Sequence, residues 1–565
     1  MLRTDENPVV SPTRESGPLT VGQPETVSLT TRDGVRLDAD IYRPALGGPY
    51  PVLLQRQAYG RRIACTICYA HPAWYAAHGY VVVVQDIRGR GTSEGFFRAG
   101  ENETWDGVET IDWVSKLDGV TGDVGMYGFS YQGYNQLLAA RAAGPALKAL
   151  APAMAPWHAR ESWAFENGAL RLQGALGWAT QIAAETARHK GDVEAFAELL
   201  AESRSLNIGG AIQARPAYIE RHRELSHYHR WLDTPADAQY WRDISPAAHV
   251  DAIAAKRLPM LFIGGWYDTH LRSTWEAFTT LAAHGNPNLQ LTMGPWLHFP
   301  WVRKTGAVDF GPAAADSMDD LHIRFFDRWL KGKQTGPANA DPIQLFDLGS
   351  HQWCGFKAIP TRAMRFALNG TGRATNDMSD GRLMPEGATP TTGIDYVVND
   401  PWRPSPSVGG AFGTPPGPVD RGHVDARGDV VTFTTAPFDA PLTLAGAVSV
   451  NLHVTCDAKS FDVGCILSRV AKSGQVIQLT DGYCSIATCA PRDVVSIPMR
   501  ATCATLAAGE ALRLSISAAS FPAYPLNPGT GEDPTNTPSA NAKVITLGIK
   551  YGPGQQSTLL VTLPD

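Results

Sequence analysis

GDVGMYGFSYQGYNQLLAA, residues 122–140, combines a short apolar strand, a turn of small residues around Ser130 and a helix that contains Leu and Ala. A strand that passes through a tight turn into a helix is the setting of a nucleophile elbow, which exposes a serine hydroxyl at the edge of a sheet. Gly128 supplies the small residue that such a turn needs two positions before the serine. The next glycine, Gly133, comes three positions after the serine, so the motif is GxSxxG rather than the commoner GxSxG, and it is less specific on its own.

The segments around this turn alternate between predicted strands and helices. An Asp-Gly turn joins two alternating segments in 27–44, and the strands PVLLQR (51–56) and YVVVVQD (80–86) follow. A wholly apolar run such as YVVVVQD suits a strand that is covered on both faces. The elements predicted next are a helix at 105–117, a strand at 124–127, a helix at 131–143 and a strand at 148–153. This alternation predicts a parallel sheet with helices on both sides, an α/β fold.

The chain of 565 residues exceeds the size at which a single core usually stops growing, and its sequence pattern changes at three points. Residues 1–155 form the first part of the predicted α/β core, and residues 246–340 form its second part, where the strand pattern resumes. Residues 156–245 are rich in Ala, Glu, Arg, His and Trp at helical spacing and are predicted to be an inserted helical cap. From 341 to 565, short alternating segments such as VVTFTTAPF predict an all-β sandwich or jelly-roll domain.

The amino-acid composition limits the class of protein and the kinds of partner to be expected. Apolar residues make up 44% and charged residues 18%, as in globular proteins, and the net charge of −6 comes without a long Lys/Arg run that would follow nucleic acid. The polar N-terminus does not resemble a signal peptide, and no run reaches the ~18 apolar residues of a membrane span, so we expect a cytoplasmic protein without a membrane partner. Eight cysteines are too few for a disulfide scaffold, and the lone CxxC of Cys65 and Cys68 is interpreted as buried thiols rather than zinc ligands.

A serine hydroxyl is a weak nucleophile that needs a base and an orienting carboxylate, and in α/β-hydrolases these follow the serine in the order Asp, His. Asp268 comes just after the predicted strand 258–265, and His298 just after the strand 289–294. Because ligands bind at the carboxyl ends of parallel strands, we expect Ser130, His298 and Asp268 to converge as nucleophile, base and orienting group. Activity should then rise with pH as His298 loses its proton.

Three other side chains compete for these roles. His270 and His158 are alternative bases, and Asp86 is an alternative carboxylate. His270 lies only two positions from Asp268 and would give a different geometry, whereas Asp86 precedes the serine and is better explained as a residue that fixes the RGRG turn.

Together these stretches resemble the cocaine esterase-like (CocE/NonD) hydrolases, the group that also includes X-prolyl dipeptidyl peptidases and α-amino-acid ester hydrolases. The resemblance covers nearly the whole chain and rests on collinear stretches. They are TRDGVRLDADIYRP (31–44), QDIRGRGTSEG (85–95), GMYGFSYQGY (125–134), GGWYDTHLRSTWEAF (264–278), GPWLHF (294–299), RFFDRWLKG (324–332) and RLSISAASFPAYPLNPGTG (513–531).

The resemblance implies an α/β-hydrolase core, a helical cap inserted after the strand that follows the elbow, and a C-terminal jelly roll. It accounts for GxSxxG as the form of the elbow typical of the group, and it implies the same triad. It further implies an oxyanion hole made by the hydroxyl of Tyr59 and the backbone N–H of Tyr131. The group usually has proline before that tyrosine, and this chain has Ala58. No metal or organic cofactor is implied.

The start of the cap, APWHARESWAFENGALRL (155–172), offers walls for an acyl pocket. Aromatic walls favour a flat or hydrophobic acyl group, although the same residues could simply pack the cap onto the core. The predicted substrate-binding residues are Trp157, Trp163, Phe165 and Glu166 from the cap and Trp266 from the core.

Recognition of an α-amino group would need a carboxylate near the acyl site, a role open to Glu166 or Glu161. The sequence favours a carboxylic-ester hydrolase with a small-molecule ester or amide substrate, and it leaves an X-prolyl dipeptidyl peptidase, an α-amino-acid ester hydrolase and a homodimer open. A non-catalytic binding protein on the same scaffold would be expected to have a broken elbow or triad, and neither is broken.

Overall fold

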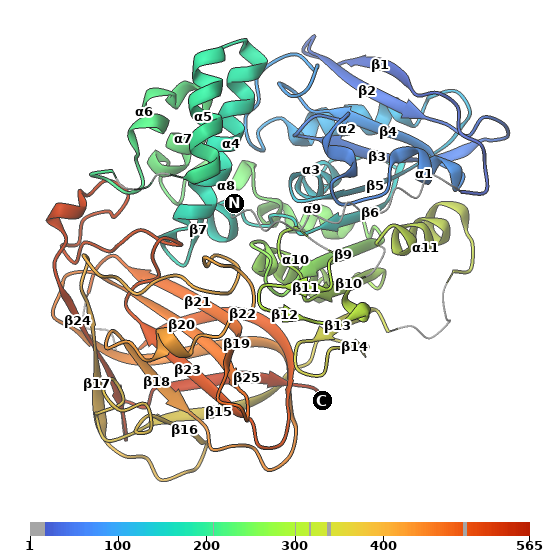
Figure 1. The fold of residues 1–565 in the computed structure, drawn as a ribbon. Helices are drawn as coiled ribbons and strands as arrows, with labels where there is room; N and C mark the ends of the chain where they lie inside the picture. Colours follow the sequence, from blue (N-terminus) through green and yellow to red (C-terminus); the bar gives the residue numbers. More distant parts are fainter. Residues whose placement is uncertain are drawn as a thin grey trace.

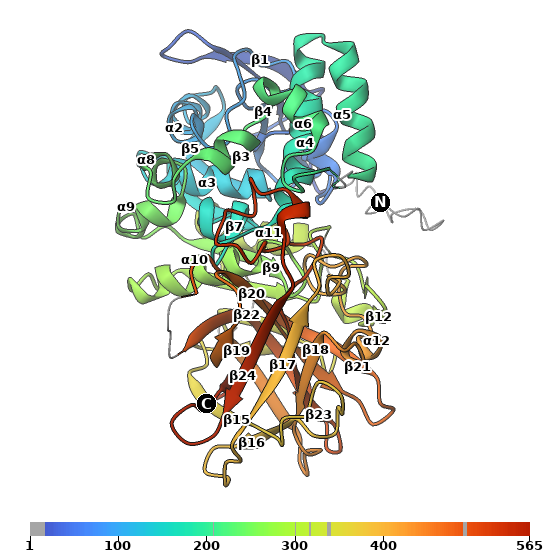
Figure 2. The same ribbon diagram turned by 90° about the vertical axis from the view of Figure 1, so that its left-hand side faces the viewer.

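The computed structural model describes residues 17–206, 208, 210–299, 301–315, 318–335, 341–489 and 494–565. Three regions are visible in Figure 1: an α/β core in blue and yellow-green, a group of cap helices in teal and green, and a β domain in orange and red. Turned by 90°, the β domain lies at one end of the molecule and the core and cap at the other (Figure 2). The chain therefore has the predicted architecture of an α/β-hydrolase core with an inserted helical cap and a C-terminal jelly-roll domain.

The core is a ten-stranded sheet in which the central strands run parallel and the edge strands antiparallel. In spatial order its strands are β1 (Glu25–Thr30), β2 (Arg36–Tyr42), β4 (Val81–Asp86), β3 (Tyr50–Gln57), β5 (Val120–Phe129), β6 (Leu147–Ala153), β9 (Met260–Gly265), β10 (Leu289–Gly294), β13 (Ile343–Asp347) and β14 (Gln352–Phe356). The last two strands follow residue 340, so the core sheet extends past the domain boundary predicted there.

Helices cover both faces of this sheet, as the apolar runs predict. In β4, Val81 and Val83 belong to one apolar cluster and Val82 and Val84 to the opposite one, because successive side chains of a strand alternate between faces. The first face is covered by α2 (Glu103–Val114), α3 (Tyr131–Ala140), α9 (Val250–Ala255) and α10 (Leu271–Ala283), and the second by α1 (Pro72–Ala77) and α11 (Met318–Lys331). Gly332, with φ of 66°, follows α11 in the left-handed conformation that commonly ends a helix.

The cap enters the chain after β6 and has an apolar cluster of its own. It begins with a π-helical turn at Arg160–Ala164 and a small hairpin, β7 (Phe165–Glu166) and β8 (Ala169–Leu170). Its α-helices are α4 (Leu172–Lys190), α5 (Val193–Ser205), α6 (Ala217–Arg221), α7 (Tyr228–Asp233) and α8 (Gln239–Asp243).

The β domain contains an eleven-stranded sheet, and its buried apolar side chains form one cluster with those on the first face of the core sheet. Its strands are β15 (Arg362–Asn369), β16 (Arg382–Pro385), β17 (Gly393–Asn399), β18 (Val430–Thr434), β19 (Leu442–Cys456), β20 (Phe461–Val470), β21 (Val476–Ile486), β22 (Val495–Leu506), β23 (Ala511–Ser517), β24 (Ile545–Tyr551) and β25 (Thr558–Leu563). The short elements that remain are β11 (Lys304–Thr305), β12 (Val308–Asp309) and α12 (Gly422–Asp425).

The β domain is joined to the other two regions by hydrogen bonds. Asn167 in the turn of the cap hairpin donates to the carbonyl of Tyr483 on β21 at 2.8 Å, and Tyr267 of the core donates to the carbonyl of Gln478 at 3.1 Å. Within the described part of the chain, no helix is both long and apolar enough to cross a membrane.

Candidate active site

The elbow between β5 and α3 holds Ser130 in a strained backbone conformation, with φ of 60° and ψ of −118°. A non-glycine residue at positive φ is costly and persists at functional turns where the surrounding structure holds it. Here the Ser130 N–H donates to the carbonyl of Ala153 at 2.8 Å. A Cβ atom at Gly128 would lie 2.4 Å from the Cβ atom of Gln132, which explains why this position carries glycine.

The spacing of GxSxxG also has a packing reason. Gly133 lies in the first turn of α3, directly against the end of β6. A Cβ atom at this position would lie 2.8 Å from the Cβ atom of Ala155 and 3.1 Å from the carbonyl oxygen of Ala153. The third residue after the serine must therefore be glycine for the helix to pack this closely against the neighbouring strand.

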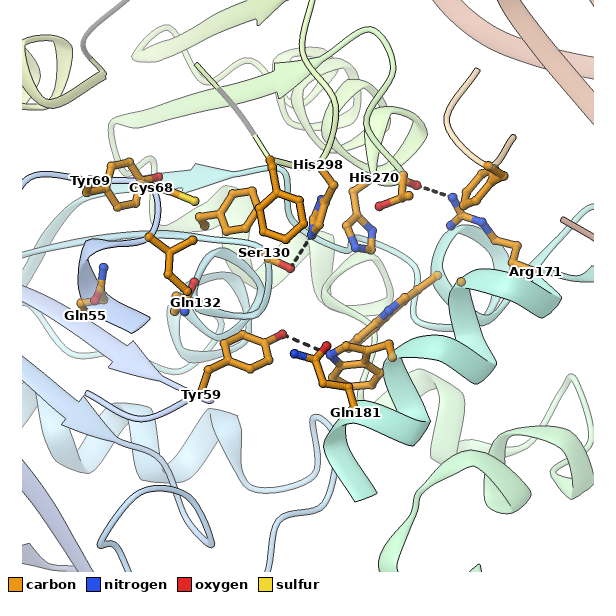
Figure 3. A pocket seen from close by; sticks show the side chains of 18 residues that line it. Gln55, Tyr59, Cys68, Tyr69, Ser130, Gln132, Arg171, Gln181, His270 and His298 are labelled. Carbon is orange, nitrogen blue, oxygen red and sulfur yellow. Dashed lines mark hydrogen bonds between the residues drawn. The ribbon is translucent and has the colours of Figure 1, made fainter. Parts of the chain in front are cut away.

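The three residues predicted to converge form a hydrogen-bonded series at the carboxyl edge of the sheet. The Oγ atom of Ser130 lies 3.0 Å from Nε2 of His298, and Nδ1 of His298 lies 2.6 Å from Oδ1 of Asp268. Asp268 follows β9 and His298 follows β10, and these strands are neighbours in parallel register. Asp268 is fully buried, whereas the His298 side chain is 28% exposed and can reach substrate and water (Figure 3).

The rival residues occupy other positions. His270 lines the same cavity, with its ring 5.3 Å from that of His298, and burial holds its pKa well below the usual value, so this imidazole is neutral at working pH. Asp86, the last residue of β4, accepts hydrogen bonds from Arg61 and from the N–H of Thr92 just after the RGRG turn, so it lies outside the cavity in the turn-fixing role that the sequence suggested. His158 does not line the cavity either.

Tyr59 and Tyr131 are placed beside the serine in two different ways. Tyr59 follows β3, and its phenol oxygen accepts a hydrogen bond from the indole N–H of Trp178 at 3.1 Å (Figure 3). Burial raises the pKa of this phenol, so its O–H remains available as a donor. Tyr131 is the first residue of α3, where backbone N–H groups have no partner within the helix. Its side chain has a separate role, because its phenol donates a hydrogen bond to Glu103 at 3.1 Å.

The serine opens into a cavity of about 360 Å³. Its walls are largely aromatic and neutral, with Arg171 as the charged side chain among them. The lining residues are Gln55, Tyr59, Ile67, Cys68, Tyr69, Phe129, Ser130, Gln132, Trp163, Arg171, Gly174, Trp178, Gln181, Thr269, His270, His298, Phe299 and Phe412. The size and the apolar walls are typical of a small-molecule site.

Of the residues predicted to bind substrate, Trp163 lines this cavity, and the other aromatic ones do not. Trp157 is 1% exposed and packs in the core, and Phe165 packs in the cap beneath the guanidinium of Arg160. Trp266 donates its indole N–H to the carbonyl of Phe346 at 2.7 Å, deep in the core. These three residues take the packing role that the sequence left as the alternative.

Glu166 also lies outside the cavity, because its carboxylate is used elsewhere. It is 1% exposed and accepts hydrogen bonds from Arg500 and, at 2.7 Å, from Tyr524, both in the β domain. Burial by itself would raise its pKa, but the charges of Arg500 and Arg171 outweigh burial and leave the pKa lowered, so the carboxylate stays ionised. Glu166 therefore links the cap to the β domain.

Two walls that the sequence did not suggest are Trp178 of α4 and Phe412 of the β domain. The guanidinium of Arg171 lies 4.1 Å over the Phe412 ring and donates to the carbonyls of Ser162 and Thr269, so it ties cap, core and β domain together at the cavity. Trp178 belongs to a run of cap helix whose spacing indicates only packing, and Phe412 stands in a Gly- and Pro-rich segment without periodicity. Neither residue stands in a sequence pattern that would place it at the active site.

An elbow serine hydrogen-bonded to a histidine that is held by a buried carboxylate, on an α/β core, defines the class of serine hydrolases. Residues 33–300 match the X-Pro dipeptidyl-peptidase (S15 family) model, and residues 335–559 match the X-Pro dipeptidyl-peptidase C-terminal non-catalytic domain. The chain is 30% identical over 536 residues to the cocaine esterase of Rhodococcus sp. (strain MB1 Bresler), a match that covers 89% of this chain and 92% of the relative. The chain belongs to the S15 family of serine peptidases and esterases.

Solved structures share the whole fold. An α-amino acid ester hydrolase matches with a TM-score of 0.79 at 20% identity and covers 99% of this chain and 98% of its own. An aminopeptidase from a marine-sediment Thaumarchaeota archaeon matches with a TM-score of 0.79 at 19% identity over 100% of both chains. At this level of identity the similarity concerns the fold alone.

Proposed function

We propose that this protein hydrolyses carboxylic esters of small molecules through an acyl-enzyme on Ser130, and that the acyl group is uncharged and flat or hydrophobic. The observation that carries the proposal is the hydrogen-bonded series of Ser130, His298 and Asp268 at the floor of an aromatic cavity that no carboxylate lines among the described residues. The cocaine esterase relative, similar over most of its length, supports ester hydrolysis.

In the proposed mechanism, Nε2 of His298 takes the proton of the Ser130 hydroxyl as its oxygen attacks the ester carbonyl. Asp268 holds Nδ1–H and stabilises the imidazolium that forms. His298 then gives the proton to the leaving alcohol, and the ester bond breaks to leave the acyl-enzyme. Water, deprotonated by the same imidazole, attacks the acyl carbon and releases the acid and the free serine.

The negative charge on the carbonyl oxygen needs two donors, and we assign them to the phenol O–H of Tyr59 and the backbone N–H of Tyr131. Tyr59 lines the same cavity as Ser130, Tyr131 follows Ser130 directly in the chain, and the N–H of Tyr131 lies at the positive end of α3. Because Tyr59 stays protonated, it can donate a hydrogen bond throughout the working pH range.

Tyr59→Phe is expected to lower kcat by about 10² to 10³, the usual effect of removing one oxyanion donor, with little change in KM. Steady-state hydrolysis of p-nitrophenyl acetate measures both. Tyr134→Phe is the matched control, because its buried phenol donates to the carbonyl of Ile244 and does not line the cavity. This control should lose stability and keep kcat within about threefold, a small change beside that of an oxyanion donor. A Tyr59→Phe enzyme that behaved like the control would require another donor in the hole.

The choice of an ester without an α-amino group follows from the charges around the cavity. A substrate ammonium would need a carboxylate, but Glu166 is buried against Arg500 and Glu161 lies outside the cavity beside Arg160. The charged group in the lining is the cation Arg171, which would repel an ammonium. These positions favour the esterase over an X-prolyl dipeptidyl peptidase or an α-amino-acid ester hydrolase.

We expect p-nitrophenyl benzoate to be cleaved with a kcat/KM at least about 10² higher than an aminoacyl p-nitrophenyl ester or an X-Pro p-nitroanilide, because burying an unpaired ammonium costs several kcal/mol. Assays with the purified protein and these substrates test the expectation, and Ser130→Ala gives the background rate. A preference for the aminoacyl substrates would favour the α-amino alternative.

Glu166→Gln separates the two alternatives further. The variant removes a carboxylate that contacts Arg500 and Tyr524, so it should lower the melting temperature while leaving the ratio between benzoate and aminoacyl substrates unchanged. Selective loss of activity on α-amino substrates would mean that Glu166 contributes to substrate recognition.

A further inference from the structure

The phenol of Tyr59 receives a hydrogen bond from the cap. The indole Nε1–H of Trp178, on α4, points at the Tyr59 oxygen at 3.1 Å (Figure 3). An indole nitrogen is a donor only, whereas a phenol can both donate and accept. The Tyr59 oxygen must therefore be the acceptor in this pair, and its own hydrogen must point to another group.

We propose that Trp178 is a positioning residue that fixes the direction in which the Tyr59 hydroxyl donates, an inference that rests on the proposed function. With one lone pair of the phenol oxygen occupied by the indole N–H, the O–H is directed toward Ser130 and the oxyanion that forms there. Hydrogen bonds in series polarise one another, so the indole also makes the phenol a stronger donor. The hole is thus ordered before substrate binds.

The indole is held rigidly by the rings around it. The Trp178 ring lies 4.7 Å from Trp163 and 4.5 Å from His227, and it is stacked on Trp231 at 5.7 Å with an interplanar angle of 25°. Burial, together with the charge of Arg90, lowers the pKa of His227 to about 3, so this neighbour stays neutral at working pH. The charge of this neighbour therefore stays constant over the pH range in which the enzyme would act.

Helix α4 is in turn attached to the core beside the hole. Arg90, in the RGRG segment, donates to Oγ1 of Thr186 at 3.3 Å and to the carbonyl of Ile182 at 3.5 Å, one turn after Trp178. Its guanidinium lies 4.0 Å over the ring of Phe97. The segment that the sequence suggested as a turn therefore holds the cap helix whose indole contacts Tyr59.

The test is a double-mutant cycle of Trp178→Phe and Tyr59→Phe, assayed on p-nitrophenyl acetate, whose acyl group is too small to need the aromatic walls. Trp178→Phe keeps an aromatic ring and removes the N–H. We expect kcat to fall roughly tenfold, as for the loss of one neutral hydrogen bond, with KM nearly unchanged. In the Tyr59→Phe background the same change should have little further effect on kcat, because the hydroxyl that it orients is gone.

Trp241→Phe is the control. Its buried indole N–H donates to the carbonyl of Thr234 within the cap at 3.4 Å, outside the cavity. Its ring packs on Trp231 and Tyr240 rather than on Trp178. This variant should lose comparable stability, keep kcat within about threefold, a change smaller than one hydrogen bond, and combine additively with Tyr59→Phe. Circular dichroism and melting temperatures check that each variant is folded.

Additive effects of Trp178→Phe and Tyr59→Phe on kcat would overturn the proposal, as would a Trp178→Phe variant that changed only KM. If Trp178→Phe does not fold, Trp178→Met, whose flexible side chain can fill the space, provides the same comparison. Failure of the proposed function gives a different result, since wild-type protein would then show no Ser130-dependent hydrolysis of p-nitrophenyl acetate.

Discussion

Ser130→Ala is expected to lower kcat for ester hydrolysis by about 10⁶, the largest effect of any single change in this chain. In the proposed mechanism this hydroxyl is the group that becomes acylated, and its Oγ atom lies 3.0 Å from Nε2 of His298. Without it, His298 and Asp268 have no nucleophile to activate, so the remaining parts of the site contribute only binding and oxyanion stabilisation. Steady-state hydrolysis of p-nitrophenyl acetate measures the loss. Mass spectrometry after treatment with a fluorophosphonate should find the adduct on Ser130.

Ser162→Ala is the control for this change. Ser162 lies at the start of the cap, outside the cavity, and is also buried. Its hydroxyl is 2.6 Å from that of Ser273 on α10. The control should lower stability, keep the fluorophosphonate adduct on Ser130 and retain ester hydrolysis. An adduct on another residue, with Ser130→Ala still active, would refute the acyl-enzyme on Ser130.

The second largest effect is expected for Asp268→Asn, with a fall of about 10⁴ in kcat. The carboxylate accepts the Nδ1–H of His298 at 2.6 Å and so keeps Nε2 free to take the serine proton. An amide can donate instead of accept, which favours the other tautomer, and it no longer stabilises the imidazolium. The single-turnover rate of acylation with p-nitrophenyl acetate measures this step directly.

Asp86→Asn provides the matched control, since Asp86 is the other buried carboxylate that the sequence offered. It pairs with Arg61 rather than with an imidazole, so its replacement should lower the melting temperature and leave acylation of the folded protein largely intact. If Asp268→Asn retained a near-wild-type rate, the orienting carboxylate would have been assigned to the wrong residue.

The parts of the site that could be predicted from the sequence are those with a local signal. The elbow can be recognised from one short stretch of sequence. Gly128 and Gly133 are required there because a Cβ atom at either position would be too close to neighbouring atoms. Asp268 and His298 each follow an apolar strand, and parallel strands end at one edge of the sheet. Their convergence therefore follows from chain order and topology.

The substrate pocket could not be predicted in the same way. The π-helical turn at Arg160–Ala164 breaks the periodicity that a helix would give the start of the cap. Trp163 therefore reaches the cavity, while Phe165 and Glu166 enter a short hairpin and turn elsewhere. Phe412 comes from a loop far along the chain, and the packing of the β domain brings it to the cavity.

The contact of Phe412 with the cavity has a consequence for how such enzymes diversify. The region from 335 to 559 matches a domain described as non-catalytic, yet it supplies one pocket wall and the Arg500 that neutralises Glu166. A chimera that received this module from a relative would have a different residue at this wall of the pocket, together with a new interface. Recombination at the boundary between the two matched regions could therefore change substrate range in one step, without touching the nucleophile.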